Sequence, residues 1–317
     1  MNTTLALIVR RLGAAALTLL LVSIVVFSIT SLLPGDAAEE ALGQGATPEA
    51  VEALRAKLGL DQPAHLRYGR WLIGMLSGDP GQSLASNLPV SELIGTRLPK
   101  SLLLAGAAAI VSVPIALLIG VFAAMYRGSR LDRALSVITL SMVAVPEFLV
   151  ATIAVLIFAV QLQWLPALSF APENPSVGEF LRAYAMPVMT LSFVIIAQMA
   201  RMTRAAVIDQ LSQPYIEMAV LKGVSSTRVV LAHALPNAIG PIANAVALSL
   251  SYLLGGAIIV ETIFNYPGLA SLMVDAVTSR DMPLLQTCAM IFCCAYLGLV
   301  LLADVCAIVS NPKLRTR

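Results

Sequence analysis

Six long apolar runs dominate the sequence, and each is long enough to cross a lipid bilayer as a helix. A hydrocarbon core about 30 Å thick requires about 20 apolar residues, because each helical residue rises about 1.5 Å. The chain is 58% hydrophobic and 12% charged, and a soluble core cannot bury that much apolar surface. We therefore predict an all-α membrane protein whose six transmembrane helices occupy residues 12–33, 101–126, 134–161, 185–206, 238–260 and 284–309.

The charges between these runs predict how the chain is oriented. The segments assigned to the cytoplasmic side contain twelve Lys or Arg and three acidic residues. The segments assigned to the opposite side contain eight Lys or Arg and thirteen acidic residues. Short cytoplasmic loops of membrane proteins are enriched in Lys and Arg. This distribution predicts that both termini are cytoplasmic and that residues 36–100 lie outside.

Residues 36–100 form the long polar segment between the first two predicted transmembrane helices. Apolar spacing predicts helices at 48–58 and 62–76, and Leu88-Pro89-Val90 predicts the start of a further short helix. We interpret the segment as a folded extracytoplasmic cap or as a contact surface for a protein that delivers cargo.

Recognisable catalytic motifs are absent from the sequence. It has no P-loop, no zinc-binding His–Glu pattern and no nucleophile elbow. Its two histidines, His65 and His233, are far apart, and its four cysteines lie in one apolar run, where they fit buried side chains better than disulfides. We expect a conduit rather than an enzyme, with no cofactor on this chain and the energy source on another protein.

Polar and glycine residues inside the apolar runs are candidates for helix packing or for a transport pathway. Glu147 follows a predicted break at Pro146, where it either stabilises freed backbone groups or a neighbouring helix, or faces a pathway. Asp304 is interpreted as an anchor that reaches the membrane interface or the arginines after the second helix. Pro114 is expected to interrupt that second helix. The same two alternatives, packing or pathway, apply to Gln198, Asn244, Gly255, Gly256 and Glu261.

The stretch 215–237 is a polar loop between two apolar runs, and its layout predicts two short helices that meet at a glycine. Pro214 suits a first helical position and Glu217 suits the first turn. Gly223 is placed to stop the helix in a left-handed conformation. One weakly apolar face is predicted to contain Ile216, Ala219, Val220 and Gly223.

The second helix of this stretch is predicted to be capped by Ser225 or Ser226 and to end or bend at Pro236. The first helix, about nine residues long, spans only about 13 Å, so it is too short to cross a bilayer and is marginal alone in water. We therefore expect it to pack on the membrane helices of this chain or on a partner.

Parts of this stretch resemble the EAA motif of the permeases of ABC importers. The matching residues are Glu217-Met218-Ala219, Gly223 six residues after the glutamate, and Leu235-Pro236. Met218 replaces the first Ala of the motif, and His233 stands where an aliphatic residue is common, although a His-x-Leu-Pro-Asn ending is frequent in the peptide branch.

Further motifs are similar to the first permease subunit of the dipeptide, oligopeptide and nickel importers, over almost the whole chain. The tail departs from the usual Asp-Pro-Arg ending by having Asn311 in place of Asp. The motifs are Leu58-Gly59-Leu60-Asp61-Gln62-Pro63, Tyr68-Gly69-Arg70-Trp71, Gly78-Asp79, Arg97-Leu98-Pro99, Gly255-Gly256-Ala257-Ile258-Ile259-Val260-Glu261-Thr262-Ile263-Phe264, Tyr266-Pro267-Gly268-Leu269, Arg280-Asp281-Met282-Pro283 and Asn311-Pro312-Lys313-Leu314-Arg315.

The resemblance implies a type I ABC importer permease fold in a bacterial inner membrane. It implies a second homologous permease, two cytoplasmic P-loop ATPases that bind ATP and Mg, and an extracytoplasmic substrate-binding protein, besides membrane lipid and without nucleic acid. In this family the loop forms coupling helices that dock into the ATPase. ATPase docking is thereby assigned to Tyr215, Ile216, Glu217, Met218, Ala219, Val220, Leu221, Lys222 and Gly223.

On this reading the chain divides into residues 1–96 (first helix and extracytoplasmic segment), 97–311 (permease core, with the coupling loop at about 212–237) and 312–317 (cytoplasmic tail). The expected cargo is a di- or oligopeptide, with a nickel complex, glutathione or haem as alternatives within the family. Outside the family, the alternatives are a self-contained secondary transporter or channel subunit and, more remotely, a membrane enzyme.

Overall fold

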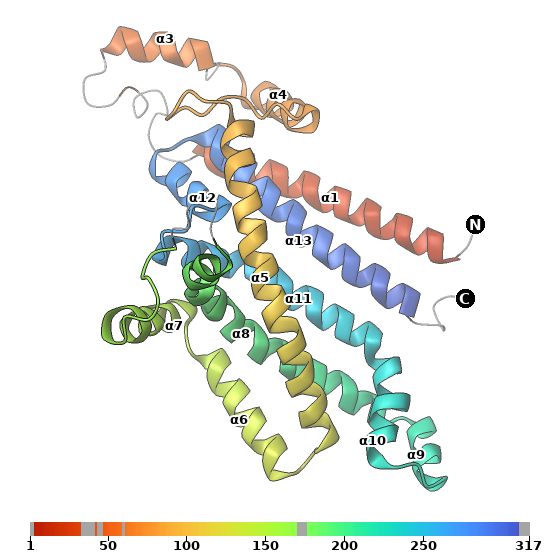
Figure 1. Ribbon diagram of the computed structural model, residues 1–317. Coiled ribbons are helices and arrows are strands. Elements are labelled where there is room, and N and C mark those ends of the chain that lie inside the picture. The colour runs from red at the N-terminus through yellow and green to blue at the C-terminus, as the bar shows by residue number, and fades with distance from the viewer. Residues whose placement is uncertain (1–2, 33–41, 43–46, 59–60, 170–175, 311–317) are drawn as a thin grey trace. The chain divides into compact units, whose positions relative to one another are not determined.

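The structure, a computed structural model, describes residues 3–32, 42, 47–58, 61–169 and 176–310 (Figure 1). The predicted end of the first helix at 33–36, the Gly59-Leu60 part of one motif and the basic tail 311–317 lie outside the described residues. Helices account for nearly all the rest, which confirms the all-α prediction. In chain order they are α1 (Thr3–Leu32), α3 (Pro48–Leu58), α4 (Ala64–Ser77), α5 (Val90–Met125), α6 (Arg130–Ala144), α7 (Glu147–Ala154), the π-helix η1 (Val155–Gln161), α8 (Val177–Leu211), α9 (Pro214–Leu221), α10 (Ser226–Arg228), the π-helix η2 (Val229–Ala234), α11 (Leu235–Ile263), α12 (Leu269–Thr278) and α13 (Met282–Ser310).

Five helical segments among the described residues are long and apolar enough to cross a membrane, and the bent pair of α6 with α7 and η1 makes a sixth if it forms one span. This agrees with the predicted class of multi-span helical membrane protein. In the polar segment, α3 has the predicted bounds, and α4 is shifted by one or two residues.

Helix α5 corrects two expectations. It begins at Val90, where a separate short helix was predicted, and it continues without a break through Pro114 to Met125. One proline removes a single backbone hydrogen bond, which membrane helices tolerate when neighbouring groups satisfy the freed carbonyl. The predicted short helix and the second transmembrane run are therefore one element.

The third apolar run is broken at Pro146, as predicted, and its two halves meet at an angle of 95°. Val145 has φ −84° and ψ 124°, outside the helical region. The proline ring disfavours helical backbone at the preceding residue, and this local constraint ends α6. Glu147 is consequently the first helical residue of α7.

The described chain divides into two compact units. The first unit comprises Met1–Gly13, Leu103–Tyr266 and Tyr296–Arg317, and the second comprises Ala14–Leu102 and Pro267–Ala295. In the first unit α8 and α11 lie side by side (Figure 1). Its core consists of apolar side chains from α5, α8 and α11, among them Leu104, Leu191 and Leu253.

Gly120 sets the closest approach of α5 to α8 in this unit. A Cβ atom at this position would lie 2.6 Å from the Thr203 Cβ and 2.7 Å from the Ala200 carbonyl oxygen. Small residues at such crossings allow two helix backbones to meet, which is a main source of packing energy between membrane helices. Glycine is thus needed at position 120 because a side chain would clash with α8, and not because the backbone has a conformation that only glycine adopts.

In the second unit, the carboxylate of Asp281 joins segments that are far apart in the sequence. Asp281 is fully buried and accepts hydrogen bonds from the Ser83 hydroxyl, from the Ala85 N–H at 3.4 Å and from the Leu284 N–H at 3.4 Å. It therefore holds the 83–85 loop against the start of α13 and caps that helix. This contact gives a structural reason for the Arg280-Asp281-Met282-Pro283 motif.

An aromatic cluster fixes α4 to α1 in the same unit. The ring of Phe27 on α1 lies 5.4 Å from that of Tyr68 and 5.8 Å from that of Trp71, both on α4. A hydrogen bond of 2.8 Å between Ser23 and the Tyr68 hydroxyl adds to this contact. The motif that contains Tyr68 and Trp71 therefore supplies packing residues.

Replacement of Gly120 by Ala is expected to destabilise the chain by about 1–3 kcal/mol, because the added methyl overlaps backbone atoms of α8. Thermal unfolding of the purified protein in detergent measures the effect. The matched control is Gly106→Ala in the same helix, where nothing lies within 4 Å of an added Cβ. Equal melting temperatures for the two variants would contradict this packing.

Replacement of Asp281 by Asn is expected to weaken the 83–85 contact by about 1.5–3 kcal/mol, because hydrogen bonds to an ionised carboxylate are replaced by weaker ones. Hydrogen exchange of residues 81–89 should accelerate. Asp275→Asn, a change at an exposed position of α12, is the control and should leave this exchange unchanged.

Candidate coupling surface

Helix α9 begins where the sequence predicts. Gln213 occupies the N-cap position with an extended backbone, and Pro214 takes the first helical position, where a missing N–H is harmless. The Gln213 carbonyl accepts from the N–H groups of Ile216 at 3.0 Å and Glu217 at 3.4 Å. The Glu217 carboxylate lies in the first turn, where the helix dipole favours a negative charge.

The end of α9 is a Schellman motif centred on Gly223. Gly223 has φ +79°, which confirms the predicted left-handed stop. The Gly223 N–H donates to the Val220 carbonyl at 2.9 Å, and the Val224 N–H donates to the Ala219 carbonyl at 3.2 Å. These bonds reverse the chain and place Val224 beside Ala219.

One face of α9 is held by a small apolar cluster. Ile216 is buried with Val229 and Ala234 of the following helical segment, and Ala219 and Val224 pack against them. Val220, predicted to share this face, is exposed instead, because the chain reversal at Gly223 brings Val224 into its place. A glycine stop followed by an apolar residue was the sequence signal for this contact.

Around the rest of its circumference α9 leaves four large apolar side chains exposed. Their exposed fractions are 42% for Tyr215, 55% for Met218, 57% for Val220 and 74% for Leu221. We call these four residues the α9 surface. Glu217 and Lys222 are also exposed beside it. An apolar patch with a charged rim on a well-anchored short helix has the composition of a protein-docking surface.

The Tyr215 side chain anchors α9 to its neighbours. Its hydroxyl donates to Gln210 Oε1 of α8 at 3.1 Å and also hydrogen-bonds the Asn237 side chain of α11. Burial raises the pKa of Tyr215 above its usual value, so its phenol remains a donor at neutral pH. The contacts fix α9 between the end of α8 and the start of α11.

The segment after Gly223 differs from the predicted second short helix. Ser225 occupies the N-cap position, as expected, but its side chain makes no capping hydrogen bond. The helix then passes through the π-helical turn η2 and continues into α11, so that Pro236 neither ends nor interrupts it. The wider π-turn, in which the Leu235 N–H reaches the Val230 carbonyl, removes the clash that Pro236 would cause in a regular helix.

An ion pair fixes the start of α6 to α8 close to α9. Arg204 Nε and Nη2 donate to the two carboxylate oxygens of Asp132 at 2.7 Å and 2.9 Å. The Asp132 carboxylate also accepts from the Gly128 N–H at 2.9 Å. This paired geometry is the strong form of an arginine–carboxylate contact. Charge counting along the sequence does not reveal this pair, because Asp132 and Arg204 are 72 residues apart.

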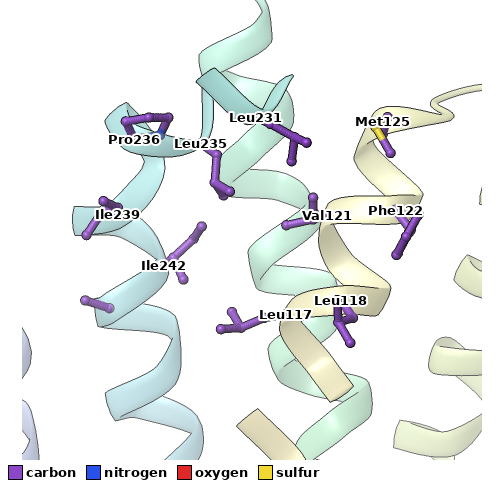
Figure 2. Close-up of a pocket in the computed structure, with 11 residues that line it drawn as sticks. Leu117, Leu118, Val121, Phe122, Met125, Leu231, Leu235, Pro236, Ile239 and Ile242 are labelled. Atoms are coloured by element: carbon purple, nitrogen blue, oxygen red, sulfur yellow. The ribbon is translucent and has the colours of Figure 1, made fainter. Parts of the chain in front are cut away.

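A groove of about 650 Å³ lies beside η2 and the start of α11 (Figure 2). It is lined by apolar side chains of α5 on one side and of η2 and α11 on the other, with Pro236 among them. The side chains of α5 therefore do not close the space between α5 and the segment that connects α9 to α11. The lining residues are Leu117, Leu118, Val121, Phe122, Met125, Leu231, Leu235, Pro236, Ile239, Ile242 and Ala243.

The remaining candidates lie apart from α9. Glu147 is half-buried against Gly256 of α11, and Gly255 is exposed beside it. Glu261 is fully buried. For Gln198 and Asn244, considered as helix-packing or pathway residues, the structure shows no side-chain hydrogen bond among the described residues; Gln198 is half-buried and Asn244 is exposed.

Asp304 pairs with an arginine other than those expected. Its carboxylate lies 3.1 Å from Arg11 Nη1 of α1, and not beside the arginines that follow the second run. Sequence spacing did not specify that α1 is the helix whose arginine pairs with Asp304. Among the described residues, no three His, Cys, Asp or Glu side chains gather as a metal site would require.

The fold is that of a helical membrane protein with five or six spans among the described residues. A family model described as the binding-protein-dependent transport system inner membrane component matches residues 116–316, and the corresponding N-terminal model matches residues 4–105. The chain belongs to this family.

Relatives match over the whole chain. A putative peptide transport system permease protein of Brucella abortus is 36% identical over 310 residues, which cover 98% of this chain and 99% of the relative. The glutathione transport system permease protein GsiC of Salmonella paratyphi A is 36% identical over 308 residues, covering 97% and 98%. A probable peptide ABC transporter permease protein of Sinorhizobium fredii is 34% identical over 308 residues, with the same coverage.

The family defines the general role of the chain. It is a multi-pass inner-membrane permease subunit of an ABC importer, which works with ATPase and binding-protein partners and is not itself an enzyme. Family membership decides against a self-contained secondary transporter.

Replacement of Gly223 by Ala is expected to destabilise the end of α9 by about 1–2 kcal/mol, because an L side chain with φ +79° is strained although space is free around it. Hydrogen exchange of residues 214–224 should accelerate several-fold. Gly223→Asn is the control, since Asn tolerates this conformation better, and its exchange should lie between those of the wild type and Gly223→Ala.

Proposed function

We propose that this chain is one of two homologous permease subunits that form the translocation path of a peptide importer, and that α9 is its coupling helix. Two cytoplasmic ATPases, which bind ATP and Mg, would close on ATP binding and move α9. The α9 surface and the residues around it, Tyr215 to Gly223, would contact the ATPase, and both chain termini would be cytoplasmic.

The observation that carries this proposal is the exposed α9 surface on a rigidly anchored helix. Its Met218, Val220 and Leu221 side chains are more than half exposed, whereas Ile216 and the Schellman motif hold the helix against the rest of the unit. A helix held in this way would transmit a movement of the bound ATPase to α8 and α11 instead of unwinding. The neighbouring Arg204–Asp132 pair extends that connection to α6.

Peptide cargo is supported by relatives named as peptide permeases, and glutathione cargo is supported to a similar extent by the relative named as a glutathione permease. Glutathione is itself a short peptide with a free amino group, so the two alternatives share a ligand chemistry. Mass spectrometry of the ligand that co-purifies with the binding protein of the system distinguishes them.

Replacement of both Met218 and Leu221 by Asp is expected to reduce co-purification of the ATPase subunits at least tenfold, because two exposed apolar contacts become charged. The thermal stability of the chain should remain unchanged, since both positions are exposed. Ile73→Asp, an equally polar change at an exposed position of α4, is the control. Retention of the ATPase by the double variant would refute the assignment of α9 as the coupling helix.

A further inference from the structure

Glu147 is an acidic residue without a partner at the break between α6 and α7. Pro146 is the N-cap of α7, and Glu147 follows it directly after the 95° bend. The side chain is half-buried, and no group in the described parts of the chain donates a hydrogen bond to it or forms an ion pair with it. Of the two structural roles considered from the sequence, a hydrogen bond from Glu147 to freed backbone groups is not formed in the described parts of the chain, whereas a contact with a neighbouring helix is made at Gly256 of α11.

The Glu147 carboxylate lies in a notch formed by Gly256 of α11. A Cβ atom at Gly256 would be 2.5 Å and 2.7 Å from the two carboxylate oxygens and 2.9 Å from the carboxylate carbon. An alanine at this position would therefore displace the carboxylate. Gly255, the next residue, has nothing within 4 Å of an added Cβ. The glycine pair thus leaves space both for the carboxylate and beside it.

Two helices independently place Glu147 far from α9 within the first unit. Asp132, at the start of α6, pairs with Arg204 near the α9 end of α8, and α6 then rises for 15 residues or about 22 Å before Glu147. Along α11, Gly256 lies 21 residues or about 32 Å after Leu235. The hydrocarbon core of a bilayer is about 30 Å thick, so Glu147 lies toward the membrane face opposite the coupling helix.

From this geometry we propose that the Glu147 carboxylate binds the ammonium group of the cargo at the outer part of the translocation path. Intramembrane acids typically pair with cationic groups or line substrate pathways, and the break of a discontinuous helix is where transporters form such sites. Peptides and glutathione both present an ammonium group, which donates charge-assisted hydrogen bonds to a carboxylate. The inference rests on the proposed function, because it takes the cargo to be a peptide.

A thiol at position 255 reports the local charge in the assembled complex. Gly255→Cys is introduced after the four native cysteines have been replaced by Ala, and the thiol is treated with a cationic trimethylammonium-ethyl or an anionic sulfonatoethyl methanethiosulfonate. The rate of each reagent is divided by its rate with a free thiol in solution. This normalised rate is expected to be about tenfold higher for the cationic reagent than for the anionic one. In the Glu147→Gln background this preference should fall below about twofold.

The ligand is tested with a matched pair of probes, alanyl-alaninamide, which has an ammonium group, and N-acetyl-alanyl-alaninamide, which has none. The first is expected to slow the cationic reagent at least threefold, and the second is not. In the Glu147→Gln variant, neither probe should slow the reaction of the cationic reagent. Gly256→Ala, which fills the notch, should abolish the protection, whereas Gly298→Ala on α13, with free space around it, should not.

Several results would overturn the inference. They are a thiol that reacts with neither reagent, equal rates for both reagents (which would indicate a carboxylate already paired with a cation of another subunit), equal effects of the two probes, and unchanged protection in Gly256→Ala. The proposed function is judged separately by the ATPase activity that the binding protein stimulates in the wild-type complex. If that activity is present while the probe experiment fails, only the role of Glu147 is refuted.

Discussion

Every proline in a membrane helix removes a backbone N–H, and the lipid offers no replacement for the lost hydrogen bond. This chain meets that constraint in three different ways. Helix α5 absorbs Pro114 without a break, Pro146 ends α6 with a sharp bend, and a π-turn precedes Pro236. The two prolines that change the helix geometry adjoin the two features to which we assign function, namely the carboxylate at 147 and the coupling helix.

Helix α11 connects these two features. Its first turns adjoin η2 and the apolar cluster under α9, and its later turns contain the notch at Gly256. A movement imposed on α9 therefore acts on a single long helix whose far part contacts the α6–α7 break. The groove beside η2 lies on one side of this connecting segment, and the buried cluster of Ile216, Val229 and Ala234 joins the segment to α9.

Local features of the chain were predictable from sequence because they depend on neighbouring residues. The bounds of α3, the start of α9 at Pro214, the left-handed Gly223 and the break at Pro146 all follow from backbone preferences of a few residues. The bounds of the candidate coupling helix are therefore predictable from the sequence without knowledge of the residues that pack against it.

Contacts between distant segments were not predictable in the same way. Asp304 pairs with Arg11, Asp281 contacts Ser83, and Gly120 meets Thr203, and the sequence does not indicate which of these residues come together. Gln198 and Asn244 show the converse, because polarity made them candidates for helix packing, yet their side chains form no hydrogen bond among the described residues. Hydrophobic periodicity places residues on helix faces, but the choice of neighbouring helix depends on packing of the whole unit.

The contact between Asp281 and the 83–85 loop has a consequence for biosynthesis. The loop is translated 196 residues before its acceptor. At about 5–20 residues per second, the ribosome needs roughly 10–40 s to cover that interval. During this time the Ser83 hydroxyl and the Ala85 N–H lack the Asp281 carboxylate to which they donate hydrogen bonds in the finished protein. The second unit is thus completed only near the end of translation, and a membrane-resident holdase would find its substrate in that interval.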